Sequence, residues 1–135
     1  MEGVERTVDR VRATGEVFTP NALVLEILRG IPLDEFRPGA NVLDPACGDG
    51  QFLVAAKHVK MLFFGMTESA ALAEIFGIDI MRDNVELCRR RLGGGTVVHG
   101  DALHPEADLE GQSAWDRACM RLFAGCGHPP SDAPR

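Results

Sequence analysis

The chain has 135 residues, which is long enough for one domain with a real hydrophobic core that needs no disulfide or metal. Its 45% apolar and 25% charged residues are typical of an ordinary globular protein. The 14 basic and 20 acidic residues give a net charge of -6, which argues against a protein that grips nucleic acid over a broad basic surface.

The start of the chain is polar and carries acids, so it is not typical of a signal peptide, and the longest apolar run is too short to cross a bilayer. We therefore expect a cytoplasmic protein that does not contact membranes and whose four cysteines are free thiols. Cys119, Cys126 and His128 match no familiar zinc spacing, so no metal site is predicted.

The first half of the chain predicts two helices and one strand after a polar N-terminal segment over residues 1–17. A helix begins at Phe18-Thr19-Pro20, because threonine caps a helix well and proline fits its first turn. Gly30 and the following proline end it. A short buried strand over 41–44, a turn over 46–50 and a helix over 51–61 follow.

The second half predicts a helix over 67–74 capped by Thr67, a strand over 75–80, a helix over 82–92 ended by three glycines, and a strand over 96–99. On the helix over 82–92, Arg89, Arg90 and Arg91 are predicted to face largely outward as a solvated surface. Residues 114–123 fit either a strand or a short helix, and residues 124–135 predict a disordered tail.

Strands and helices that alternate in this way are typical of a parallel sheet with helices on both faces, here over residues 18–123. The three predicted strands end at Asp44, Asp79 and Asp101. Ligands of open α/β sheets bind beyond the carboxyl ends of the strands, so three acids in register there predict one site.

The stretch VLDPACGDGQFL joins the first strand to the next helix, and Gly48 and Gly50 allow a sharp turn and a close approach to a ligand. Asp44 and Asp49 would repel a pyrophosphate but suit an ammonium or sulfonium group. Asp79 can accept hydrogen bonds from ribose hydroxyls, with Ile80 covering a purine. Asp101 can accept a hydrogen bond from an exocyclic amine beside Ala102 and Leu103. S-adenosylmethionine has this composition.

Each acid also has a purely structural interpretation. Asp44 can belong to a turn, Asp79 can cap the helix that begins near Arg82, and Asp101 can cap a later turn. The site interpretation is favoured because the three acids occur together at successive strand ends.

Four segments, TGEVFTPNALVLEIL, VLDPACGDGQFL, IFGIDIMRDNVELCRRRL and VVHGDAL, resemble the N-terminal motifs of the adenine-specific DNA methyltransferases of restriction–modification systems. The resemblance runs from about Thr14 to Leu103, and Phe52 is shared with the acid and glycines of the second segment. It implies a Rossmann-like S-adenosylmethionine-dependent methyltransferase fold, here truncated or minimal.

The resemblance also implies roles for individual residues. Those matching the segment that closes over the methionine part of the cofactor are Phe18, Thr19 and Pro20. Those matching the loop around its amino and carboxylate groups are Asp44, Ala46, Gly48 and Gly50. Asp79 and Ile80 match the ribose and adenine contacts, and Asp101 and Ala102 match the contacts to the adenine edge.

The sequence departs from that family where the target base is received. Members carry an (N/D)PP(Y/F) motif at the end of a fourth strand, whose polar groups accept hydrogen bonds from the target amine and whose aromatic ring stacks on the flipped base. Trp115-Asp116 resembles the start of that strand, but no such motif follows, and the nearest string, residues 127–131, lacks the aromatic residue. Catalytic residues are therefore not assigned.

Three hypotheses follow. The chain is a DNA adenine methyltransferase that needs a partner, a specificity or catalytic subunit, to recognise DNA. Alternatively, it is a non-catalytic module that binds S-adenosylmethionine as a regulatory or decoy subunit. In the third hypothesis it is the product of a truncated or frameshifted methyltransferase gene.

Overall fold

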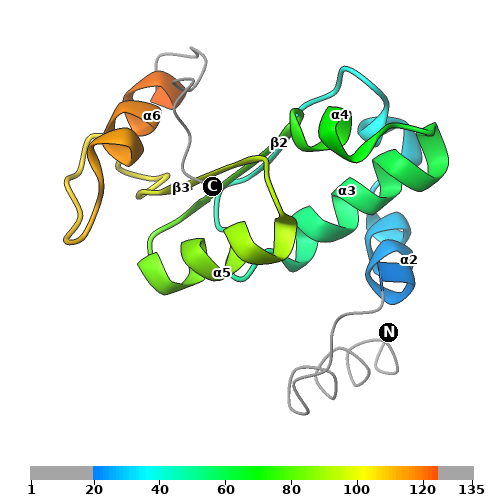
Figure 1. Cartoon of the computed structure of the whole chain (residues 1–135), viewed down its shortest axis with the longest axis horizontal. Coiled ribbons are helices and arrows are strands. Elements are labelled where there is room, and N and C mark those ends of the chain that lie inside the picture. The colour runs from blue at the N-terminus through cyan, green and yellow to red at the C-terminus, as the bar shows by residue number, and fades with distance from the viewer. Residues whose placement is uncertain (1–19, 125–135) are drawn as a thin grey trace.

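Three parallel strands form the centre of the structure, and the computed structural model describes residues 20–124. The strands are β1 (Val42–Asp44), β2 (Ile75–Asp79) and β3 (Thr96–His99), and they lie in the order β1-β2-β3 (Figure 1). Helices connect neighbouring strands, as parallel pairing requires. This arrangement confirms the predicted Rossmann-like α/β fold in a minimal form.

The helices begin and end close to the predicted residues. They are α2 (Pro20–Gly30), the short 3-10 helix η1 (Leu33–Phe36), α3 (Gln51–Phe64), α4 (Glu68–Leu72), α5 (Arg82–Leu92) and α6 (Ala114–Ala124). Thr67 caps α4 as predicted, because its Oγ1 accepts a hydrogen bond of 3.1 Å from the Ala70 amide. Gly93 ends α5 with a positive φ of 78°. Helix α3 is longer than predicted and ends at Gly65.

Both faces of the sheet are covered by helices. Val42, Ile75 and Val97 point to one face, where they form the larger core with α3 and α5. Helix α2 packs on the outer side of α3. The alternate residues Ile78 and Val98 point to the opposite face and pack against α6. Figure 1 shows α6 on one side of the strands and α3 and α5 on the other.

Residues 114–123 form a helix, so the interpretation of Trp115-Asp116 as the start of a fourth strand is wrong. Cys119 and Met120 are buried, and Trp115 and Phe123 pack beside them at helical spacing. Ser113 and Asp116 form a capping box in which each residue bonds the other's amide. These local bonds and the apolar stripe explain why a helix forms here.

Some predictions fall on residues that the structure does not describe. They concern the polar segment over 1–17, Phe18, Thr19, and the tail after Ala124, which is the last residue of α6. None of the helices between Pro20 and Ala124 is long and apolar enough to span a bilayer.

Candidate functional site

The three acids of the predicted site lie at the same edge of the sheet, but they are staggered and not in register. Asp44 pairs with Gly77, two residues before Asp79, and Asp79 pairs with His99, two residues before Asp101. Each step of two residues advances about 6–7 Å along a strand. Asp44 and Asp79 point to the same face of the sheet, because Gly77 and Asp79 are alternate residues of β2. An elongated ligand can reach acids that are offset in this way better than a compact one can.

Asp79 is the best connected of the three acids, and only 8% of it is exposed. Its Oδ2 accepts a hydrogen bond of 2.9 Å from the Gly48 amide. Its Oδ1 accepts from the amide of Met81 at 2.8 Å and from the side chain of Asn84 at 3.3 Å. A carboxylate has about four acceptor positions, so one position on Oδ2 is left for a ligand hydroxyl. The predicted cap of α5 by Asp79 is wrong, because Met81 is the N-cap residue and no side chain caps the helix. Asp79 instead fixes the turn before α5 through the Met81 amide, and it leaves room for a functional role.

The loop between β1 and α3 has an unusual backbone at its two glycines. Gly48 has φ of 55° and Gly50 has φ of 93°, both in the left-handed region. A side chain at Gly50 would lie 2.8 Å from the Cys88 sulfur, whereas the space beside Gly48 is open. Gly50 therefore allows α5 to pack on the loop, and Gly48 leaves its surface accessible.

Asp44 forms the turn that the structural interpretation predicted, since its Oδ1 accepts a hydrogen bond of 3.1 Å from the Ala46 amide. Gly50 precedes α3 and supplies no side-chain cap, and the first turn of α3 contains no acid. The amides of that first turn can therefore bind an anionic group such as a carboxylate. The loop thus presents a carboxylate for a cation beside amides for an anion, a combination that suits a zwitterionic amino acid.

The second loop acid, Asp49, does not add a free negative charge to the site. Its Oδ2 forms an ion pair of 2.7 Å with Arg91 of α5. Arg89 is also engaged, because it donates to the Val97 carbonyl and pairs with Asp116. The prediction that these arginines form a solvated outer face is thus wrong for Arg89, which is only 23% exposed, while Arg90 is exposed.

Asp101 caps the turn that follows β3, as the structural interpretation predicted. Its Oδ1 accepts from the amides of Leu103 and His104 at 3.0 and 3.2 Å, and its Oδ2 lies 3.3 Å from His104 Nδ1. Leu103 is 87% exposed, whereas Ala102 packs against the core below α6. Leu103 therefore lies on an open surface, Asp101 is partly buried, and Ala102 contributes to packing.

Cys47 adds no charge to the loop. A hydrogen bond with Cys88 and burial raise the pKa of the Cys47 thiol far above its ordinary value, with smaller contributions from Asp79 and Asp44. Cys47 therefore stays protonated at neutral pH. Its amide donates to the Ile78 carbonyl at 2.9 Å and fixes the loop against β2.

Phe52 lines a cavity of about 400 Å³ between α2 and the start of α3. Leu23, Ile27 and Ile31 form much of its apolar wall, with Gln51 at its edge. Pro20, the first residue of α2, matches the predicted start of that helix. Phe52 and α2 therefore enclose apolar space next to the glycine loop.

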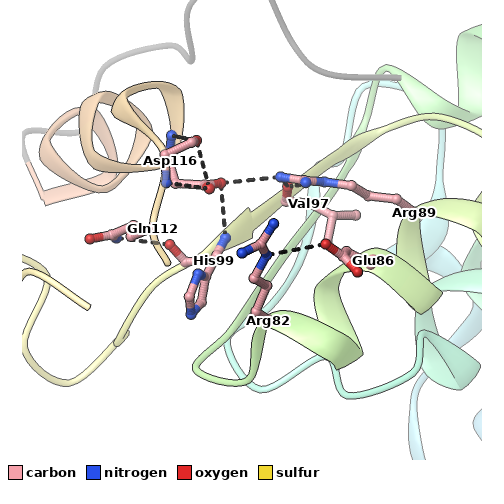
Figure 2. A network of polar contacts seen from close by, with 8 residues as sticks. Arg82, Glu86, Arg89, Val97, His99, Gln112 and Asp116 are labelled. Carbon is pink, nitrogen blue, oxygen red and sulfur yellow. Dashed lines mark hydrogen bonds and ion pairs between the residues drawn. The ribbon is translucent and has the colours of Figure 1, made fainter. Parts of the chain in front are cut away.

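The end of β3 is fixed by a polar network from α6 that the sequence did not reveal (Figure 2). Asp116 is 4% exposed, and its Oδ1 accepts from the His99 amide and from Arg89, both at 3.1 Å. Gln112 donates to the His99 carbonyl at 2.9 Å. The His99 ring reaches the Ile80 carbonyl at 3.0 Å. Helix α6 thus holds the β3 end, which in turn contacts the residue after Asp79.

Sequence reasoning missed Asn84, Cys88, Arg91 and His99 as partners of the site. Only His99 left a signal, as the one ionisable residue of the short strand β3. The other three lie on α5, where nothing in the helical pattern distinguishes a side chain that faces the glycine loop from one that faces solvent.

Residues 7–93, nearly two thirds of the chain, match the sequence model of the family described as N-6 DNA Methylase. No solved structure matches the chain.

Proposed function

Because the chain belongs to the N-6 DNA methylase family, we propose that it binds S-adenosylmethionine at the carboxyl ends of β1, β2 and β3. The observation that carries the proposal is the Asp79 carboxylate, which joins β2, the Gly48 amide and the start of α5 and keeps one acceptor position open. When bound, S-adenosylmethionine supplies a methyl group on a sulfonium that is already activated for transfer.

In this proposal, each residue of the site contacts a different part of the cofactor. Asp44 faces its cationic end, and the first amides of α3 bind its carboxylate. Asp79 accepts from the ribose hydroxyls. Ile80, which is 53% exposed, covers a face of the adenine, and Asp101 accepts from its edge beside Leu103. The family resemblance assigns the methionine part to Phe18 and Thr19, which lie outside the described residues.

We propose that methylation of an adenine amino group in DNA is the reaction this site serves, with the target-receiving groups supplied by a partner chain. Support comes from the region after β3, where residues 100–124 form a capped turn and α6 and carry no polar–Pro–Pro–aromatic string. The acidic balance of the chain also favours a partner as the main DNA contact.

A non-catalytic cofactor-binding module is the second candidate. It is favoured by α6, which occupies the sequence position where the family resemblance led us to expect a fourth strand. Transfer of a labelled methyl group to DNA, measured with the chain alone and with candidate partner chains, separates the two. Transfer under either condition identifies an enzyme component, and binding without transfer under both identifies a module.

Isothermal calorimetry with S-adenosylmethionine tests the shared proposal. We expect Asp79→Asn to weaken binding by at least about tenfold, because a hydrogen bond to a charged group is lost. The matched control is Asp83→Asn, an exposed acid of the first turn of α5, which should bind like the unaltered chain. The proposal would be contradicted if the unaltered, folded chain did not bind S-adenosylmethionine, or if Asp79→Asn and Asp83→Asn bound it equally well.

Gly48→Ala and Gly65→Ala form a second matched pair. Both glycines have a left-handed backbone, with φ of 55° and 65°, and open space beside the Cα. Each alanine should therefore lower stability by a similar amount, about 1–2 kcal/mol. Only Gly48→Ala should weaken cofactor binding, by about tenfold, because its methyl group enters the space of the ligand. Equal affinities of the two variants would show that the cofactor does not approach Gly48.

A further inference from the structure

His99 is a buried histidine whose ring is only half satisfied. It is 3% exposed, and its Nε2 lies 3.0 Å from the Ile80 carbonyl oxygen. Its Nδ1 is buried and has no hydrogen-bond partner among residues 20–124. Since a carbonyl oxygen only accepts, Nε2 is the donor of this bond. A buried polar atom without a partner costs stability, so this ring calls for an explanation other than packing.

The carbonyl that the ring holds belongs to the residue after Asp79. At this point the chain leaves β2 and enters α5, so few ladder bonds fix the peptide. Gly100 donates to the Asp79 carbonyl at 3.0 Å, and His99 donates to the next carbonyl, that of Ile80. Together these two bonds fix the direction in which the exposed Ile80 side chain leaves the sheet.

His99 is itself held firmly enough to serve as a reference point. Its amide donates to Asp116 and its carbonyl accepts from Gln112, so both its backbone groups are bound by the α6 region (Figure 2). The acidic and basic groups nearest this network, Asp116 and Arg89, pair with one another. The backbone from which the His99 ring projects is therefore fixed independently of the ligand.

We propose that His99 is a positioning residue for the adenine of the cofactor, because its ring fixes the Ile80 peptide and thereby the apolar side chain against which the purine packs. The proposal rests on the proposed binding of S-adenosylmethionine. It assigns a role to a residue that touches neither the ribose nor the methionine part of that ligand.

A double-mutant cycle tests this role by calorimetry with S-adenosylmethionine. We expect His99→Leu and Ile80→Ala each to weaken binding by about fivefold to tenfold, the size of a lost packing contact. The double variant should bind about as well as Ile80→Ala alone, because His99 acts through Ile80. His99→Gln should recover most of the affinity, since its amide can donate to the same carbonyl. His58→Leu, at a partly buried histidine of α3, is the control and should leave binding unchanged.

The outcomes separate this inference from the proposed function. If the unaltered chain does not bind, both fail. If it binds but the effects of the two substitutions multiply, or His99→Leu binds normally, only the role of His99 is overturned. If a thermal unfolding scan shows that His99→Leu does not fold, the affinities of His99→Gln and His99→Asn for S-adenosylmethionine are compared instead. The shorter asparagine cannot reach Ile80, so equal affinities of these two variants would contradict the proposal.

Discussion

Replacing Lys60 with methionine is expected to lower the free energy of unfolding by about 3–5 kcal/mol, the largest loss that we expect from a substitution distant from the site. Lys60 is fully buried, and its ammonium lies within 2.8–3.4 Å of four acceptors. They are the carbonyls of Phe36, Arg37 and Ala40 and the carboxylate of Glu74. Methionine keeps the volume of the side chain but removes the ammonium that these four acceptors share. The Arg37 carbonyl and the Glu74 carboxylate keep only their bonds from the amides of Ala40 and Gly39, and the negative charge of Glu74 loses its partner. The midpoint of thermal unfolding should fall by roughly 10–20 °C.

Lys57→Met is the matched control, because Lys57 lies on the same helix and is also buried. Its ammonium bonds one carbonyl, that of Leu92, at 3.0 Å and an exposed acid, Glu68, at 3.4 Å. Because water can replace the ammonium at Glu68, we expect a loss of about 1–2 kcal/mol. Adding Glu74→Gln to Lys60→Met should restore part of the stability by removing the unpaired charge. A loss for Lys60→Met no larger than for Lys57→Met would contradict the buried-cluster account.

Lys60 also shows where sequence reasoning stops. A lysine in a predicted amphipathic helix is usually solvated, and the pattern of α3 gives no reason to bury it. Its acceptors come from residues 36–40 and from Glu74, which are distant in the sequence. Only the packing of η1 and of the end of α4 onto α3 brings them together. Such partners depend on tertiary contacts that local periodicity does not encode.

The strands, most helix ends and the parallel sheet could be predicted because local signals agree with the fold. Thr67 begins α4 and Gly93 ends α5, and in both cases the residue type alone indicates the helix end. The residues 114–123 were ambiguous because an apolar run of this length fits both a strand and a helix. The capping box of Ser113 and Asp116 decided for the helix, a signal that the search for a fourth strand overlooked.

The sequence predicts which acids stand at the strand ends, but it does not predict their geometry. The sequence indicates Asp44, Asp79 and Asp101 as strand-end acids, and the structure brings them to one edge of the sheet. The sequence does not reveal that the strand register offsets Asp44 and Asp79 by two residues. It also does not reveal that Arg91 neutralises Asp49. Both features are compatible with the proposed cofactor, whose positive group we assign to Asp44.

Asp116→Ala is expected to lower the free energy of unfolding by about 3–5 kcal/mol and to weaken cofactor binding as well. The carboxylate accepts from the amide and hydroxyl of Ser113, from the His99 amide and from Arg89. Removing it leaves the buried His99 amide and the Arg89 guanidinium without their acceptor and loosens α6 from β3. Because His99 then loses one of its two backbone anchors, the Ile80 carbonyl should be held less firmly.

Ser113→Ala separates the cap of α6 from the rest of this network. It removes the hydroxyl partner of Asp116 but leaves the bonds from His99 and Arg89, so we expect a loss of about 1 kcal/mol in chemical denaturation and unchanged cofactor affinity. Comparable losses for Ser113→Ala and Asp116→Ala would mean that the acid serves only the helix end. A larger loss for Asp116→Ala, together with weaker binding, would instead link α6 to the cofactor site through His99. Helix α6 would then stabilise the cofactor site from the face of the sheet opposite α3 and α5.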